Sequence, residues 1–330
     1  MKKTISTAFV VLFVFSGFTV SINSEQESFH SDGDTLYVGG SGSGNYSTIQ
    51  AAIENASDGD TVFVYSGIYH LTDTINFVKK INLLGEHKNT TILTSEQNQN
   101  QLLNINAEEI SIRQFTLQNI IITNLHEDHV TICNNTFKIN VYNQNWGNGV
   151  INSEGLHHTF KDNTIILYNQ TGYKKPYHGI NLGVSHSIIS NNTITGAKTG
   201  LYINGYDNTI LGNTFIENEI GLWFNFPASA PAVNQITDNN FIDNQNHADF
   251  FITLNDPFFS LLSNLISYHG IPSQNWNHNY WENHNSNIPK KIKGHLNIDP
   301  LEILGIDTRV QYTFQIPWTE TDPNPASTPQ

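Results

Sequence analysis

The chain has 330 residues, and its 15 lysines and arginines against 29 aspartates and glutamates give a net charge of −14 at pH 7. Nucleic acid is therefore not an expected partner, because phosphate binding depends on clustered lysine and arginine. Charged residues make up only 13% of the chain and hydrophobic residues 38%, which is enough apolar material for a core and excludes a disordered chain. The abundance of asparagine argues against an ordinary helical bundle.

The first 24 residues have the features of a secretory signal. Lys2 and Lys3 precede an apolar run from Ala8 to Val20, and small or polar residues follow it. This run is shorter than the about 20 residues that cross a bilayer, and no second hydrophobic span follows. We therefore expect a chain exported to the extracellular space or the cell envelope, with no transmembrane segment in its mature form.

Residues 46–60 are predicted to cap the first turn of a repetitive domain. Ser47 and Gln50 match the S-x-x-Q capping box of a helix over residues 47–56. Within that helix, Ile49, Ala52 and Ile53 would form one apolar stripe facing the core. Such a cap is needed because the end of a repeat array otherwise exposes unpaired strand edges.

A six-residue repeat recurs through the middle of the chain. Its first and sixth residues are apolar, its second and third vary, its fourth is usually Asn and its fifth is usually Thr. Copies begin at Ile132, Phe160, Ile189, Ile210 and Ile236, and a degenerate copy begins at Ile112. Their starts are 20, 28, 29, 21 and 26 residues apart, which indicates a solenoid. The alternating segments between Gly and Asn residues are too short for helices and predict strands.

Stacked turns of such a repeat place equivalent residues one above the other, about 4.8 Å apart. The asparagine of each repeat would then hydrogen-bond to the asparagine of the next turn, which gives a structural ladder of buried amides. The predicted ladder residues are Asn135, Asn163, Asn192, Asn213 and Asn239.

The repeats resemble the right-handed parallel β-helix superfamily with the pectin-lyase-like fold, and in particular its secreted NosD-like members. The resemblance is carried by residues 46–53, 58–69, 81–86 and 279–281, together with the asparagine repeats. It implies an all-β, single-stranded parallel β-helix with a short N-terminal capping helix. We expect this domain to span residues 32–281, followed by a C-terminal cap over 282–320 and a disordered tail over 321–330.

A second series of segments, each led by glycine, indicates where a ligand could bind. Strand alternation directs Tyr202, Trp223 and Phe251 outward as an exposed aromatic stripe, which Ile151 and Asn181 would continue on earlier turns. Aromatic faces edged by amides suit sugar rings. The predicted glycan-binding residues are Asn181, Tyr202, Asn204, Trp223, Asn225 and Phe251. The alternative is that an inserted loop, 226–233 or 258–269, packs over the rings.

The family resemblance also implies polysaccharide lyases and hydrolases. Lyases of this fold that act on polyuronates use basic residues, but the only arginines are Arg113 and Arg309. Hydrolases need two carboxyl groups about 5 to 10 Å apart, whereas the acids of the repeat region are scattered near predicted turns. We assign no catalytic residue and expect a non-catalytic protein that binds a polysaccharide, or a cell-surface glycan or protein. A carbohydrate-active enzyme remains the alternative.

The NosD-like resemblance further implies copper handling. His126 and His129 have a spacing typical of metal ligands, and imidazole binds Cu(II) or Zn. Copper(I) prefers thiolate and thioether ligands, of which the chain has one cysteine, Cys133, and one methionine. The carboxylates of residues 58–60 could bind calcium, but we assign them to a turn. We therefore predict no cofactor, with copper and calcium as alternatives.

Overall fold

The computed structural model describes residues 33–95, 101–124, 126–141, 149–169, 178–227, 233–254, 274–284, 288–298 and 314–330. The predicted signal lies outside the described residues, as do most of the two inserted loops. No helix among the described residues is long and apolar enough to cross a membrane.

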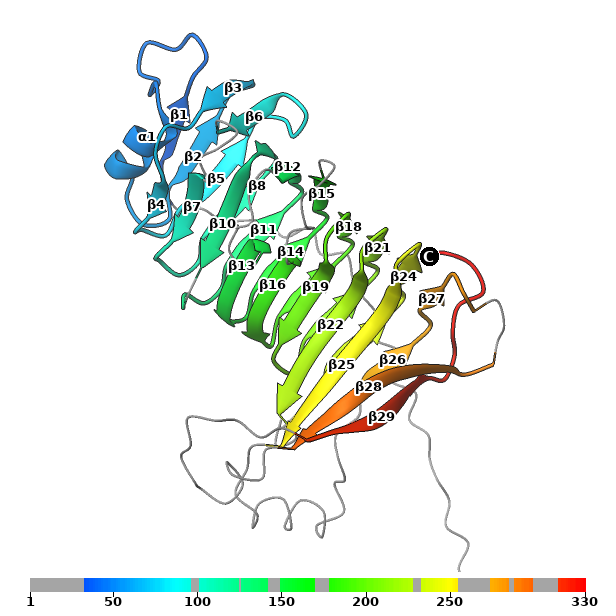
Figure 1. The fold of residues 1–330 in the computed structure, drawn as a ribbon. Helices are drawn as coiled ribbons and strands as arrows, with labels where there is room; N and C mark the ends of the chain where they lie inside the picture. The colour runs from blue at the N-terminus through cyan, green and yellow to red at the C-terminus, as the bar shows by residue number, and fades with distance from the viewer. Residues whose placement is uncertain are drawn as a thin grey trace, which may run out of the picture. The chain divides into compact units, whose positions relative to one another are not determined.

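From Thr61 to Ile298, successive strands of the chain belong in turn to three sheets, here named A, B and C, so that each coil contributes one strand to each sheet (Figure 1). Sheet A contains β1 (Thr35–Val38), β2 (Thr61–Val64), β5 (Asn82–Gly85), β8 (Ser111–Arg113), β11 (Thr131–Cys133), β14 (Thr159–Lys161), β17 (Ile188–Ser190), β20 (Thr209–Leu211), β23 (Gln235–Thr237) and β26 (Asn275–Asn277). Sheet B contains β3 (Gly67–His70), β6 (Thr91–Thr94), β9 (Thr116–Gln118), β12 (Thr136–Val141), β15 (Thr164–Asn169), β18 (Thr193–Thr195), β21 (Thr214–Ile216), β24 (Asn240–Ile242) and β27 (Tyr280–Trp281).

Sheet C contains the longest strands and ends in the one antiparallel pair among the described strands. Its members are β4 (Ile75–Phe77), β7 (Gln101–Ile105), β10 (Ile120–Asn124), β13 (Gly149–Leu156), β16 (His178–Ser185), β19 (Thr199–Asn204), β22 (Ile220–Pro227), β25 (Asn246–Leu254), β28 (Lys290–Ile298) and β29 (Phe314–Asp322). Every other described strand pair is parallel, and β28 and β29 are antiparallel. The parallel β-helix solenoid predicted from the repeats is thus confirmed.

The core consists of the apolar residues that open and close each repeat. Ile189 on sheet A and Ile194 on sheet B are fully buried, as are their equivalents Ile210 and Phe215 on the next coil. Like residues stack on like: the rings of Phe215 and Phe241 lie 5.2 Å apart at 24°. Residues of the repeat that alternate with these point away from the core, so a single repeat builds two faces of the coil.

Helix α1 (Ile49–Asn55) caps the N-terminal end of the coil (Figure 1). Its stripe of Ile49, Ala52 and Ile53 is buried, as predicted. The predicted capping residue is wrong by one position: Thr48, not Ser47, is the N-cap, and its hydroxyl accepts a hydrogen bond from the Ala51 N–H at 3.2 Å. Thr48 takes this role because it is the residue with extended backbone dihedrals next to the first helical turn.

The predicted asparagine ladder runs along the corner between sheets A and B. Each side-chain amide donates to the side-chain oxygen of the asparagine on the next coil, at 3.0 to 3.3 Å. The same amide also donates to a core-strand carbonyl, as Asn192 does to Phe160 at 2.8 Å. The ladder extends one coil beyond the predicted set, to Asn279.

The other two corners carry ladders that the sequence analysis did not predict. Between sheets C and A, Asn208 donates to Asn234 at 2.9 Å, and the Asn234 N–H donates to Gln274 at 2.9 Å. Between sheets B and C, Asn218 donates to Asn244 at 3.0 Å. All three corners are thus closed by side-chain amides that satisfy buried backbone groups.

Strand β29 brings two buried carboxylates to the last coil. Glu320 accepts a hydrogen bond from the Trp276 indole at 2.6 Å, and Asp322 accepts one from the Trp281 indole at 3.1 Å. The predicted disorder of residues 321–330 is contradicted: Ala326 is buried and pairs with Tyr280, and the Gln330 N–H donates to Asn240. The tail is ordered because it covers the open end of sheet B.

Candidate functional site

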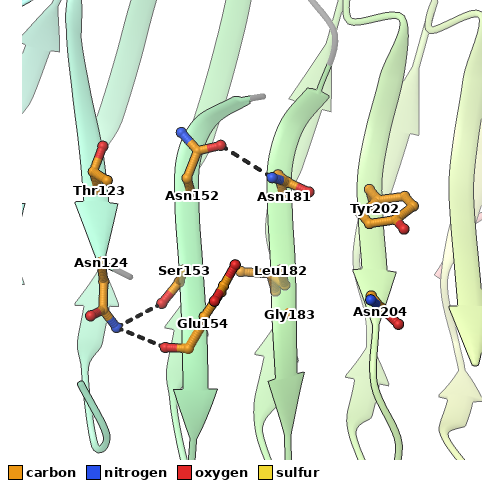
Figure 2. Close-up of a pocket in the computed structure, with 10 residues that line it drawn as sticks. All are labelled: Thr123, Asn124, Asn152, Ser153, Glu154, Asn181, Leu182, Gly183, Tyr202 and Asn204. Carbon is orange, nitrogen blue, oxygen red and sulfur yellow. Dashed lines mark hydrogen bonds between the residues drawn. The ribbon is translucent and has the colours of Figure 1, made fainter. Parts of the chain in front are cut away.

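A groove of about 390 Å³ lies on the outer face of sheet C, across β10, β13, β16 and β19 (Figure 2). It is lined by Thr123, Asn124, Asn152, Ser153, Glu154, Asn181, Leu182, Gly183, Tyr202 and Asn204. Three of these, Asn181, Tyr202 and Asn204, are among the predicted glycan-binding residues. Apart from Glu154, the lining side chains are uncharged hydroxyls, amides, one phenol and one leucine.

One row of side chains forms the upper edge of the groove in Figure 2. Thr123, Asn152, Asn181 and Tyr202 occupy equivalent positions on four neighbouring strands. All four are half-buried, and the Asn181 amide donates to the Asn152 side-chain oxygen at 3.2 Å. This row therefore presents a hydroxyl, two linked amides and an aromatic ring at intervals of one strand spacing, about 4.8 Å.

The floor of the groove is recessed because the residue at its centre is a glycine, Gly183. Gly183 is the partner of Glu154 in the sheet register, and a Cβ at Gly183 would meet the Glu154 Cγ at 3.2 Å. Behind the floor, the buried Asn124 amide donates to the Ser153 hydroxyl at 3.0 Å and to the Glu154 carbonyl at 3.2 Å. Polar groups thus replace the usual apolar core residues at this depth, and they fix the strands that form the groove.

An aromatic array continues from the groove across sheet C. The ring of Tyr202 lies 5.0 Å from that of His178 and 5.4 Å from that of Trp223. Trp223 is followed by Phe251 at 5.6 Å, and Phe251 by His295 at 5.5 Å. The three predicted aromatic residues are therefore brought together, but they are half-buried rather than fully exposed.

Two details of the predicted stripe are wrong. Ile151 is fully buried in the core, and its neighbour Asn152 occupies the outward position beside Asn181. Phe251 pairs with Asn225, whereas Asp249 pairs with Trp223, so the last strand is shifted by two residues from the predicted register. Alternation is the same in both registers, which is why the apolar pattern alone did not distinguish them. Asn204 and Asn225 pair as neighbours.

Burial shifts the pKa values of three titratable groups on this face in the direction that favours the neutral form. It lowers the pKa of His178 to about 4, and the charge of Lys198 acts in the same direction. Burial also raises the pKa of the Tyr202 phenol, against the opposing effect of its hydrogen bond with Asn225. The pKa of the Asp249 carboxyl is raised by burial as well. His178 and Tyr202 therefore contribute no charge to this face at neutral pH.

Two acids of this face, Glu154 and Asp249, are too far apart to act as a catalytic pair. Glu154 lies on β13 and Asp249 on β25, four strands apart in the order of sheet C. At about 4.8 Å per strand, that separation is about 19 Å, well beyond the about 5 to 10 Å used by paired glycosidase carboxylates. Glu154 is the one acid among the residues that line the groove.

The two predicted metal-ligand histidines are not close partners. His126 is highly exposed and faces Glu154, with 3.7 Å between the Nδ1 and carboxylate oxygen atoms. His129 instead stacks on His157 of the next coil, with ring centroids 5.2 Å apart. In the part of the chain that the structure describes, no group of three or more His, Cys, Asp or Glu side chains is close enough to hold a metal ion as it stands.

The carboxylates of the predicted Asp58-Gly59-Asp60 turn are engaged in backbone contacts. Asp60 accepts hydrogen bonds from the N–H groups of Asp34 and Ser57, at 2.8 and 2.7 Å. Asp58 accepts one from the Lys80 N–H at 3.0 Å. These contacts are those of a turn-forming role.

Comparison with protein families finds a match over most of the chain: the family model described as "Periplasmic copper-binding protein (NosD)" matches residues 53–286. The matched region includes every residue of the groove and the stacked histidines. No curated protein matches the chain.

Proposed function

This chain belongs to the NosD family, and from that premise we propose that it is an exported, non-catalytic protein of the cell envelope that binds a glycan in the groove on sheet C. The observation that carries the proposal is the row formed by Thr123, Asn152, Asn181 and Tyr202. Amides and hydroxyls recognise the hydroxyl groups of sugars by hydrogen bonds, and an aromatic ring offers its face to the apolar side of a sugar.

The length of the aromatic array favours a polymer over a single sugar. Trp223 continues the row of the groove beyond Tyr202, and Phe251 and His295 follow on the next strands. A chain of sugars lying across the strands would meet one side chain of this face per strand.

Charge narrows the class of glycan. The net charge of −14 and the exposed Glu154 at the groove disfavour polyuronates and other polyanions. We therefore propose neutral or amino sugars as the ligand.

A glycan array tests this proposal. The exported chain would be compared with the Asn181→Ala/Tyr202→Ala variant and with Tyr168→Ala, which removes an exposed tyrosine of sheet B. We expect the double variant to lose at least tenfold in affinity for a neutral or amino-sugar polymer and the control to bind as the parent does. Binding unchanged in the double variant contradicts the assigned groove, and release of shorter products contradicts the non-catalytic assignment.

Copper handling is the second candidate function, because the family description names copper. The observation that favours it is a column of stacked histidines at the corner between sheets C and A. The test compares two rates of copper transfer to an acceptor protein or chelator, one from the copper-loaded chain and one from a matched variant without these histidines. Faster transfer from the parent chain supports this function.

A further inference from the structure

Glu154 is the one acid among the residues that line the groove on sheet C, and its side chain lies over the floor. In Figure 2 this side chain extends from β13 toward β16. A Cβ on Gly183 would meet the Glu154 Cγ at 3.2 Å and its Cδ at 3.8 Å, so the glycine provides the space that the side chain occupies. The carboxylate thus lies within the groove, where a bound ligand would cover it.

Two hydrogen bonds hold the backbone of Glu154 from the core side. Its carbonyl oxygen accepts a hydrogen bond from the Asn124 amide at 3.2 Å and lies 3.2 Å from Nε2 of His158. Nδ1 of His158 accepts a hydrogen bond from the Val130 N–H, so Nε2 of the neutral ring carries the proton and donates it to Glu154. Asn124 and His158 are both buried, and they fix the position of Glu154 at the edge of the groove.

The carboxylate of Glu154 has a weaker partner than its backbone has. Among the described residues, its ion-pairing contact is His126, with 3.7 Å between Nδ1 and a carboxylate oxygen, which is beyond hydrogen-bond distance. The His126 side chain is 82% exposed and that of Glu154 is 57% exposed, so a ligand can displace this contact. None of the residues that line the groove is a lysine or an arginine. The groove therefore holds a carboxylate whose charge no residue of its lining offsets.

A ligand that fills the groove must remove water from this carboxylate. Covering an ionised group with a neutral surface is unfavourable unless a hydrogen bond or an opposite charge replaces the lost water. A protonated amine supplies both, and charge-assisted hydrogen bonds are about twice as strong as those between neutral groups. The net charge of −14 also attracts a positively charged polymer to the protein.

We propose that the ligand of this groove is a polymer of amino sugars with free amines, in which the protonated amine of one sugar pairs with Glu154. This inference rests on the proposed glycan-binding function and narrows its ligand. Asn152 and Glu154 lie on the outer face of β13, two residues or about 6.6 Å apart. A sugar ring on the row of Asn181 and Tyr202 can therefore direct its amine toward Glu154 while its hydroxyl groups bond to the amides.

Calorimetry with three hexasaccharides at pH 6 tests this assignment. They are the β-1,4-linked hexamers of glucosamine, N-acetylglucosamine and glucose, which differ only in the group at carbon 2: a free amine that is mostly protonated, an acetylated amine or a hydroxyl. Glu154→Gln keeps the size of the side chain and removes its charge. The matched control is Glu108→Gln, which removes the same charge from an exposed acid that does not line the groove.

We expect the parent chain to bind the glucosamine hexamer at least tenfold more tightly than the other two. Glu154→Gln should bind all three alike, and Glu108→Gln should keep the preference of the parent. The melting temperatures of the three proteins should agree, because both substituted carboxylates are exposed.

A preference that Glu154→Gln retains, or that both variants lose equally, overturns the assignment to Glu154. Equal affinity of the parent for the three hexamers, or binding on the glycan array to other sugars only, overturns the amine assignment and leaves the proposed glycan-binding function intact. Binding to no glycan of the array contradicts both.

Discussion

Asp322 accepts hydrogen bonds from both the backbone N–H and the side-chain amide of Asn279, at 3.1 and 3.0 Å. These are the two bonds that every other asparagine of the ladder gives to the asparagine of the next coil. Strand β29 therefore supplies, from a residue 43 positions further along the chain, the acceptor that a further coil would have provided.

Removing this acceptor should destabilise the C-terminal end of the coil. We expect Asp322→Ala to lower the free energy of unfolding by about 3 kcal/mol, because it leaves the buried groups of Asn279 and the Trp281 indole without a partner. Asp322→Asn should lose less, since its side-chain oxygen still accepts. Urea unfolding followed by tryptophan fluorescence measures both, and the exposed Asp73→Ala is the control. Equal stability of Asp322→Ala and Asp73→Ala contradicts the prediction.

The middle of the ladder should be at least as sensitive. Asn192 donates to Asn213 and to the Phe160 carbonyl and accepts from Asn163, all in the buried corner. Asn192→Ala is expected to lower the free energy of unfolding by about 2 to 4 kcal/mol. Asn191→Gly changes the adjacent exposed asparagine and keeps its left-handed backbone accessible, so it should lie within about 0.5 kcal/mol of the parent. Thermal unfolding by circular dichroism decides between these outcomes.

Stability should fall as the pH is lowered from 6.5 to 4. Burial lowers the pKa of His158 from 6.5 to about 4, and its Nδ1 accepts a hydrogen bond from the Val130 N–H at 3.0 Å. Between these two values the unfolded chain binds more protons than the folded chain, so protonation favours unfolding, by about 3 kcal/mol for this one group. Burial lowers the pKa of His178 and His247 too, so both act in the same direction.

His158→Asn isolates that contribution. An asparagine keeps a side-chain acceptor at this corner and does not titrate, so melting temperatures between pH 4 and 7 should vary less than in the parent. His126→Asn alters a highly exposed histidine and should leave the parent profile unchanged. A His158→Asn profile as steep as that of the parent would show that other groups govern the acid sensitivity.

Filling the groove should block the glycan without harming the fold. Gly183 is exposed, and a side chain there would occupy the space beside Glu154. We expect Gly183→Leu to bind at least tenfold more weakly to the polymer that the parent protein binds. Its melting temperature should be close to that of the parent. Calorimetry with that polymer measures the loss. Undiminished binding would place the ligand elsewhere on the protein.

The regular parts of the fold were predictable because each repeat carries its own signal. Asn135, Asn163 and Asn192 recur in one sequence context, and one such context specifies a strand, a corner and a ladder position together. The corner between sheets C and A was missed because its equivalent positions are occupied by four residue types: His158, Ser187, Asn208, Asn234 and Gln274. Each side chain accepts the same kind of hydrogen bond, yet asparagine appears at only two of the five positions.

The strand register and the stacking of residues from different coils were harder to predict, because successive coils differ in length. The repeats at Ile210 and Ile236 are 26 residues apart, and the same offset pairs Trp223 with Asp249. Applying that offset to sheet C would have corrected the position of Phe251. The offsets of 28 and 29 residues between the repeats that begin at Ile132, Phe160 and Ile189 would likewise have aligned His129, His157 and His186 in one column. Spacing within a single turn drew attention to His126 instead.

The antiparallel direction of β29 also limits how copies of this protein can associate. A second coil could extend the solenoid only by adding a strand parallel to β28, and β29 occupies that edge in the opposite direction. The carboxylate of Asp322 receives hydrogen bonds from Asn279 and has no N–H of its own to pass to a further amide. Head-to-tail growth into a filament is therefore blocked at this end, although each earlier coil forms parallel strand pairs with the coil that follows it.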